Sequence, residues 1–242
     1  MRDENGWTAS AEAWIADMNG DDGDWSRQCV LDAPMTARAL AAPVGRMLDV
    51  GCGEGRFCRK LAAHGIAAVG LDPVPALLES ARARHPDGPG GAGAYLCGHA
   101  EALPFAASSF DLVVSYLTLI DIDDCAAAVA EMSRVLTPGG RLLVANLAPH
   151  FTASSGGWTE DAEGHPLFSI DRYYEARSEW FSWRGINVRN WHRPLSLYME
   201  AFLSAGLALT HFDEPRAAGT DERAVRYRRV PWFVIMEWRK PA

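Results

Sequence analysis

The chain has 242 residues, of which 48% are hydrophobic, and a formal net charge of -8 at pH 7. This content suits one domain with a full core, and the acidic balance argues against nucleic acid or anionic membranes as partners. The five cysteines lack the spacing of a zinc site or a disulfide framework, so we expect no metal site. No apolar run reaches the ~18 residues of a membrane span, and no signal-peptide pattern opens the chain, so we expect a soluble, cytoplasmic protein.

Residues 1–45 lie outside the regular pattern of the rest of the chain and are predicted to form a helical cap. Trp7, Trp14 and Trp25 stand there among polar and acidic residues. Over residues 46–147, helical segments alternate with short apolar runs, which are "RMLDVG", "AAVGLD", "AYLCG", "FDLVVSYL" and "GRLLVANL". This alternation indicates βαβ units, and therefore a doubly wound α/β core whose parallel sheet is covered on both faces.

Two segments follow this core. Residues 148–195 are rich in aromatic side chains, and a long aromatic insertion between sheet elements is more often a lid or pocket wall than a spacer. Residues 196–242 contain an amphipathic pattern, "LSLYMEAFLSAGL", apart from its first residue, Leu195. They also contain two strand-like runs, "ALTHFDEP" and "VPWFVIMEWRK", joined by a polar loop. They predict a helix and an antiparallel hairpin at the sheet edge.

The stretch "MLDVGCGEGRF" ends an apolar strand in a Gly-x-Gly-x-Gly loop and continues as a helix. Such a loop brings bare backbone close to a ligand and offers the N–H groups of a helix start to an anionic group. A dinucleotide-binding loop has its third glycine one position later, where this chain has Arg56. The loop is therefore predicted to bind a ligand other than NAD.

Further motifs follow the loop in the order "VGLDP", "GHAEALPF", "SFDLVVS" and "RVLTPGGRLLV". With them the chain resembles the class I S-adenosylmethionine-dependent methyltransferases, in particular the small-molecule group with a type 11-like methyltransferase domain. The resemblance is strong over residues 46–147 and weak from there to the final hairpin. It implies a Rossmann-like, seven-stranded, mostly parallel sheet with helices on both faces, S-adenosyl-L-methionine as cofactor and S-adenosyl-L-homocysteine as product.

The resemblance also implies where the cofactor binds. The loop at 51–53 passes under the methionyl part, and Asp49 orders this loop or meets the ammonium group through water. Asp72 closes the second strand and should accept hydrogen bonds from both ribose hydroxyls; the alternative is a turn carboxylate before a proline. The expected cofactor-binding residues are Asp49, Gly51, Cys52, Gly53, Asp72, Pro73, His99, Ala100, Glu101, Tyr116 and Arg27.

His99 stands where the family most often has an acid that accepts a hydrogen bond from the adenine amino group. A neutral histidine accepts with one nitrogen only, so either this side chain or the backbone at Ala100 contacts adenine, with a solvent-facing His99 as the alternative. Tyr116, at the carboxyl end of the fourth strand, should face the cofactor. Asp124 is expected to cap the next helix, and the role of Asp121 is left open.

Chemical grounds make Arg27 a candidate for binding the cofactor carboxylate and His192 a candidate for the general base. A cap helix that folds over the cofactor needs a cation for its carboxylate, and arginine can bind a carboxylate through two parallel hydrogen bonds; alternatively, Arg27 is exposed beside Asp24. His192 in "NWHRPLSLY" is the candidate general base, because histidine titrates near neutral pH. The alternative is a helix start, with Pro194 in the first turn and the side chains of His192 and Arg193 bonded to backbone.

The acceptor site is expected to use aromatic side chains, because ligand pockets are concave and mostly apolar, although several of these aromatics must be ordinary core. Arginines among the lid aromatics either recognise an acidic acceptor or form a solvated face. The expected acceptor-binding residues are Trp14, Tyr116, Asp121, Tyr173, Trp183, Trp191 and His192.

Together these features predict methyl transfer by in-line displacement to a small apolar or aromatic acceptor, at oxygen, nitrogen or carbon, with no metal. RNA or protein methylation is the first alternative; the net acidity and "SYLT" in place of an Asn-Pro-Pro-Tyr type motif disfavour it. A second alternative is a protein that binds the cofactor and regulates or scaffolds without turnover. The small acceptor is the expected partner, and the chain is expected to be a monomer or a homodimer.

Overall fold

The centre of the fold is a seven-stranded sheet with the strand order β10-β11-β5-β4-β1-β2-β3. The computed structural model describes residues 5–20, 23–85 and 94–242. Strands β1 to β5 are mutually parallel, and β11 runs antiparallel to both of its neighbours, β5 and β10. The predicted sheet and its antiparallel edge hairpin are confirmed. The strands are β1 (Arg46–Val50), β2 (Ala67–Asp72), β3 (Ala94–Cys97), β4 (Phe110–Tyr116), β5 (Leu136–Leu147), β10 (Ala208–Asp213) and β11 (Phe233–Arg239).

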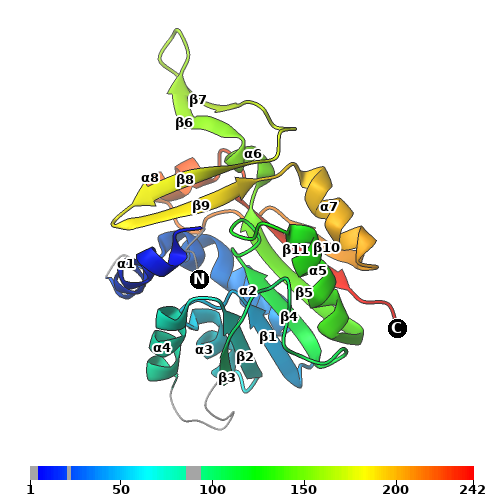
Figure 1. The fold of residues 1–242 in the computed structure, drawn as a ribbon. Helices are drawn as coiled ribbons and strands as arrows, with labels where there is room; N and C mark the ends of the chain where they lie inside the picture. The colour runs from blue at the N-terminus through cyan, green and yellow to red at the C-terminus, as the bar shows by residue number, and fades with distance from the viewer. Residues whose placement is uncertain (1–4, 21–22, 86–93) are drawn as a thin grey trace.

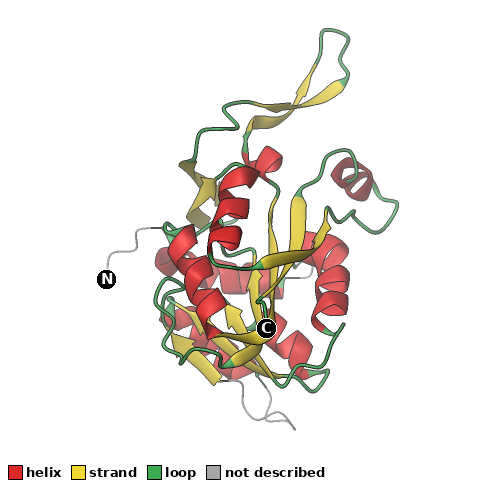
Figure 2. Cartoon of the chain, turned by 90° about the vertical axis from the view of Figure 1, so that its right-hand side faces the viewer, coloured by secondary structure: helices red, strands yellow, loops and turns green. Residues whose placement is uncertain are grey.

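Helices cover both faces of this sheet, as Figures 1 and 2 show. Side chains of α5 and α7 pack on one face, and those of α2, α3 and α4 on the other. In β4, Val113 faces the first group, whereas Leu112 and Val114 face the second, and this two-sided burial is why the strands are continuous apolar runs. The helices are α1 (Trp7–Asn19), the π-helical turn η1 (Arg27–Leu31), α2 (Asp32–Ala39), α3 (Arg56–Ala62), α4 (Pro75–Arg84), α5 (Cys125–Val135), α6 (Pro149–Thr152), α7 (Leu195–Ser204) and α8 (Glu222–Tyr227).

The connection between β10 and β11 contains α8, where the sequence predicted only a polar loop. Asp221 caps this helix by accepting a hydrogen bond from the backbone N–H of Ala224 at 2.9 Å. Tyr227, at the end of the helix, stacks on Trp232 with 4.0 Å between ring centroids. Among the helices of the described residues, none is both long and apolar enough to cross a membrane.

Residues 148–195, the segment expected to be a lid and called the lid below, contain two hairpins, and one of them is joined to the cap. In Figure 1 the β8–β9 hairpin lies above α1. Ser10 Oγ donates to the Asn187 carbonyl at 3.1 Å and accepts from the Asn187 N–H at 3.0 Å, while the Arg189 N–H donates to the Asn5 carbonyl at 2.9 Å. These bonds connect segments from opposite ends of the sequence. The lid strands are β6 (Ser154–Glu160), β7 (Pro166–Ile170), β8 (Arg177–Trp183) and β9 (Ile186–His192).

Candidate active site

The glycine loop joins β1 to α3 at the carboxyl end of the sheet. Gly51 and Gly53 have φ angles of 72° and 55°, in the left-handed region that favours glycine. Gly51 also lies close against Thr118, because a Cβ atom at Gly51 would be 2.1 Å from Thr118 Cγ2. At Gly53 the nearest atom to such a Cβ would be Trp14 Nε1, at 3.8 Å. The backbone at Gly53 is therefore open to a ligand.

Gly51→Ala is expected to destabilise the protein by roughly 2–5 kcal/mol, because alanine in a left-handed backbone costs about 1–2 kcal/mol and overlap with a packed neighbour about 1–3 kcal/mol more. Gly65→Ala is the matched control, since Gly65 has a φ of 79° with no atom within 4 Å of a Cβ. Urea unfolding of both variants measures the difference. Equal losses of stability would contradict the close approach at Gly51.

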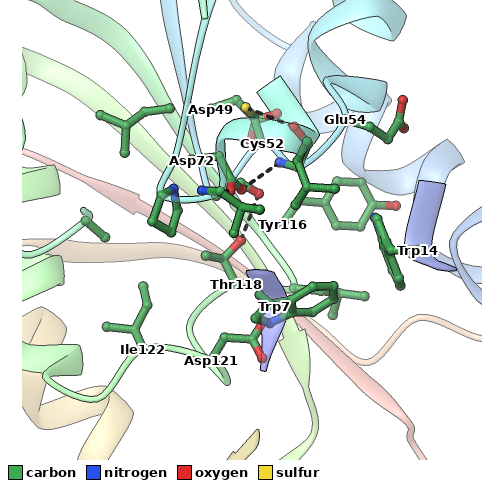
Figure 3. A pocket seen from close by; sticks show the side chains of 18 of the residues that line it. Trp7, Trp14, Asp49, Cys52, Glu54, Asp72, Tyr116, Thr118, Asp121 and Ile122 are labelled. Carbon is green, nitrogen blue, oxygen red and sulfur yellow. Dashed lines mark hydrogen bonds between the residues drawn. The ribbon is translucent and has the colours of Figure 1, made fainter. Parts of the chain in front are cut away.

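A cavity of about 450 Å³ opens above this loop, a volume within the usual range of ligand sites. Its floor comprises the carboxyl ends of β1, β2 and β4 with the loop after β3, and its roof comprises α1, η1 and Arg189 of β9. Figure 3 shows side chains from floor and roof around one space. Every cofactor-binding residue expected from the sequence lines the cavity, as do Trp14, Tyr116 and Asp121 of the expected acceptor-binding residues.

Asp72 ends β2 in the cavity floor and is buried. Its two carboxylate oxygens accept one backbone hydrogen bond each, from the N–H groups of Gly53 and Val74, both at 2.9 Å. Burial raises the pKa of Asp72 to about 6, against the lowering effect of these two hydrogen bonds. Because a carboxylate oxygen can accept two hydrogen bonds, both oxygens have capacity left for a ligand with paired hydroxyl groups.

Asp49 lies under the glycine loop and is 1% exposed. Its Oδ2 atom accepts a hydrogen bond from the Cys58 thiol at 3.5 Å, and its Oδ1 atom has no hydrogen-bond partner among the described residues. Burial is the main cause that raises the pKa of Asp49 to about 7, and the negative charge of Asp72 adds to it. A buried carboxylate oxygen without a partner favours a cationic or hydrogen-donating ligand group beside it.

Tyr116 ends β4 and lines the cavity, as the sequence predicted. Its hydroxyl group donates a hydrogen bond to Asp32 Oδ1 at 3.0 Å, and Arg56 Nη1 donates to the same oxygen at 2.8 Å. Asp32 belongs to α2 and Arg56 to α3, so this network fixes the tyrosine ring between two helices. The ring is therefore held in one position before any ligand arrives.

Arg27 lies in the roof, with its guanidinium carbon 5.2 Å from the centre of the Trp14 ring and 5.6 Å from the centre of the Tyr116 ring. It also forms an ion pair with Asp24. Arg27 is paired with Asp24, as the alternative for this residue had it, but its side chain is only 15% exposed and borders the cavity. A ligand carboxylate would have to share this guanidinium with Asp24.

The loop after β3 brings His99, Ala100 and Glu101 to the cavity wall. Ala100 is buried, while the His99 side chain is exposed. Both residues line the cavity. The structure is therefore compatible with either of them as the adenine contact.

The end of the cavity beyond Thr118 is closed by tryptophans of the roof. Trp7 and Trp14 pack edge to face, with 5.1 Å between ring centroids. Asp121 accepts hydrogen bonds from the Trp7 side chain and from Asn190 Nδ2, the latter at 2.5 Å. Burial is the main cause that raises the pKa of Asp121 to about 7. This end of the cavity is thus aromatic, with one carboxyl group held by two neutral donors.

Several lining residues were not predicted from the sequence. Trp7 lies two helical turns before Trp14 on the same face of α1, and this spacing could have identified it. Asp123 accepts hydrogen bonds from Arg189 Nη2 through both oxygens, at 2.6 and 2.8 Å, a contact between a floor loop and the lid that no local pattern reveals. The missed residues include Trp7, Thr118, Ile122 and Asp123, whereas Arg189 is one of the lid arginines expected to recognise an acidic acceptor or to form a solvated face.

Four expected site residues lie outside the cavity lining: His192, Tyr173, Trp183 and Trp191. The His192 ring is buried, with Nδ1 2.7 Å from Thr152 Oγ1 and Nε2 2.8 Å from the Tyr173 carbonyl oxygen. Burial lowers the pKa of His192. Since both ring nitrogens are engaged within the lid, neither is available in this arrangement to take a proton from a ligand in the cavity.

The alternative for this segment, a helix start, is what the structure shows. α7 begins directly after Pro194, and Arg193 donates to backbone carbonyls of the loop 119–122 at 3.0 and 2.5 Å. The expected helix cap is also confirmed, since the Asp124 side chain accepts from the Ala127 N–H at 2.9 Å. Arg193 therefore connects the lid to the body of the protein, whereas His192 joins two parts of the lid.

Comparison with known proteins gives a consistent result. The family described as "Methyltransferase domain" matches residues 48–144. The crystal structure of an S-adenosylmethionine dependent methyltransferase from Mesorhizobium loti is 30% identical, with a TM-score of 0.77, and the match covers 91% of this chain and 100% of that chain. A demethylmenaquinone methyltransferase of Renibacterium salmoninarum is 38% identical over 122 residues, 50% of this chain and 47% of that protein. A malonyl-[acyl-carrier protein] O-methyltransferase of Serratia marcescens is 35% identical over 125 residues, and these matches span less than half of the curated relatives' own length.

Proposed function

Because this chain belongs to the class I S-adenosylmethionine-dependent methyltransferases, we propose that it catalyses methyl transfer from S-adenosylmethionine to a small-molecule acceptor. One observation carries the proposal: a single cavity contains the glycine loop and Asp72 in its floor, and Trp7, Trp14 and Asp121 at its far end. Cofactor and acceptor would share this space, which is the requirement for direct transfer between them.

The residues of the floor fit this cofactor. Asp72 has capacity for the two ribose hydroxyls, and the unpartnered Oδ1 atom of Asp49 suits the ammonium group, directly or through water. The open backbone at Gly53 allows the methionyl part to lie against it. When bound, S-adenosylmethionine supplies a methyl group on a positively charged sulfur, which makes that methyl group a strong electrophile.

The contribution of the chain itself is to position the ligands and to exclude water. The Tyr116 ring is fixed by its hydroxyl bond to Asp32, so it forms a rigid part of the floor. Trp7 and Trp14 cover the space from above and present apolar surface to an acceptor. Holding two reacting groups in the correct relative position contributes several kcal/mol to lowering a barrier of this kind.

A small acceptor is favoured over a nucleic acid or a protein. The formal net charge of -8 gives no general attraction to a phosphate backbone. The acceptor end of the cavity also lies beneath α1, which the lid hairpin β8–β9 holds in place. Among the relatives, the protein from Renibacterium salmoninarum is named for a small-molecule acceptor, demethylmenaquinone.

The test has two steps. Calorimetric titration with S-adenosylmethionine, S-adenosylhomocysteine and NAD is expected to give micromolar binding of the first two and no binding of NAD. Incubation with methyl-labelled S-adenosylmethionine and a metabolite extract is then expected to yield a labelled small product. Label in macromolecules would contradict the small acceptor, and tight binding without any transfer would favour a protein that binds the cofactor without turnover.

A further inference from the structure

The acceptor end of the cavity contains one carboxyl group whose position is fixed from two sides. Asp121 lies in the loop after β4, and Figure 3 draws it beside Trp7, with Thr118 and Ile122 nearby. Its donors come from different segments, since Trp7 belongs to the cap and Asn190 to the lid. The Asp121 carboxyl group is thus placed at the junction of cap, lid and cavity.

The charge of Asp121 has no cationic partner. None of the ion pairs formed within the described residues includes Asp121, and its two hydrogen-bond donors are an indole and an amide, both neutral. The arginines that line the cavity are already paired: Arg27 with Asp24, Arg56 with Asp32, and Arg189 with Asp123. When Asp121 ionises, no side-chain cation of the described residues pairs with it directly, and only the charge of Arg27, itself paired with Asp24, favours its ionised form.

An uncompensated carboxylate in a mostly apolar, covered site is unfavourable unless the ligand supplies the missing positive charge. Neutral donors orient such a carboxylate but leave its charge in place. Resting on the proposed function, we infer that the acceptor is a small amine, which binds as its ammonium form to Asp121. A hydroxyl acceptor has no positive charge to favour the ionised form of Asp121, and an acidic acceptor would be repelled by that form.

Asp121 would also receive the proton that the amine has to lose. The N–H bond breaks, an O–H bond forms on the carboxyl group, and the electron pair stays on the nitrogen, which then becomes a nucleophile. The charge changes balance, because the ammonium loses one positive charge and the carboxylate one negative charge. The raised pKa of Asp121, about 7, makes this carboxylate a better proton acceptor than an ordinary aspartate.

The experiment compares matched amines and alcohols on the protein saturated with S-adenosylhomocysteine. The probes are phenethylamine against 2-phenylethanol, and tryptamine against 3-(2-hydroxyethyl)indole, titrated by calorimetry into the wild type, Asp121→Asn and Asp124→Asn. Asp124→Asn is the matched control: it removes the same charge three residues along the same loop, outside the main cavity, and asparagine caps a helix as well as aspartate does.

The amine of at least one pair is expected to bind the wild type and Asp124→Asn at least tenfold more tightly than its alcohol, and this preference is expected to vanish in Asp121→Asn. Alcohols that bind as tightly as amines, a preference that survives in Asp121→Asn, or failure of both amines to bind the wild type would each overturn the inference. The affinity for S-adenosylhomocysteine is measured first in all three proteins. Its absence in the wild type would instead overturn the proposed function.

Discussion

Asp72→Ala is expected to weaken S-adenosylmethionine binding by at least about 100-fold while the protein stays folded. Hydrogen bonds to a charged group contribute about 1.5–3 kcal/mol each, and two bonds to the ribose hydroxyls would be lost. The substitution also frees the N–H groups of Gly53 and Val74, which Asp72 now holds at 2.9 Å. Calorimetric titration measures the affinity, and circular dichroism with thermal unfolding verifies the fold.

Asp111→Ala is the matched control for this variant. Asp111 Oδ2 accepts hydrogen bonds from the backbone N–H groups of Gly45 and Arg46, both at 3.0 Å, at the opposite end of the sheet from the cavity. The Asp111→Ala variant therefore loses a comparable pair of hydrogen bonds, and its cavity stays unchanged. An affinity that falls equally in both variants, or that is unchanged in Asp72→Ala, would remove Asp72 from the binding site.

Cofactor affinity is expected to fall by at least about 100-fold between pH 8 and pH 5. Binding uses the ionised forms of Asp49 and Asp72, whose pKa values in the free protein are raised to about 7 and about 6. Protons therefore compete with the ligand as the pH falls first through 7 and then through 6, and one group with a pKa of 7 alone gives a factor of about 100 at pH 5. Titrations at half-unit intervals measure this profile.

The same two groups affect the stability of the free protein in the opposite direction. Because their pKa values are above the usual 3.8, the folded chain binds more protons than the unfolded chain between about pH 4 and 7, and their contribution to stability rises as the pH falls. Since these two groups stabilise the folded protein more at pH 5 than at pH 8, their titration does not cause unfolding that could explain a loss of affinity at pH 5. Asp49→Asn is expected to remove the step near pH 7 and keep the one near pH 6; an affinity independent of pH would refute both assignments.

The sheet could be predicted because its strands are buried on both faces and so form continuous apolar runs, as in Phe110–Tyr116. The helix α8 could not, because it has only six residues, three of them charged, and its place depends on a distant contact. Tyr227 stacks on Trp232, and Ala224 is completely buried. Such contacts are set by the assembled fold, and local propensity carries no information about them.

The residues of the candidate site also fall into a group that the sequence could predict and a group that it could not. Except for Arg27 of η1, the residues expected to bind the cofactor lie at the carboxyl ends of parallel strands or in the loops that follow them. The topology of the sheet brings these positions to one edge, so they line the cavity. The lid residues had no such constraint. The register of β8 with β9 places Trp191 opposite Ser178 and Trp183 opposite Ile186, and neither tryptophan reaches the cavity lining. Aromatic composition alone could not distinguish them from Trp7 and Trp14.

The position of β11 has a consequence for how the chain folds during synthesis. β5 pairs with β4 on one side, but its other side pairs with β11, which comes after all the other strands of this sheet along the chain. Until Phe233–Arg239 has left the ribosome, β5 therefore presents an open edge of unpaired backbone N–H and C=O groups. Such an edge is a template for wrong pairing with another nascent chain. Closure of the sheet thus depends on a long-range contact that can form only after β11 has been synthesised.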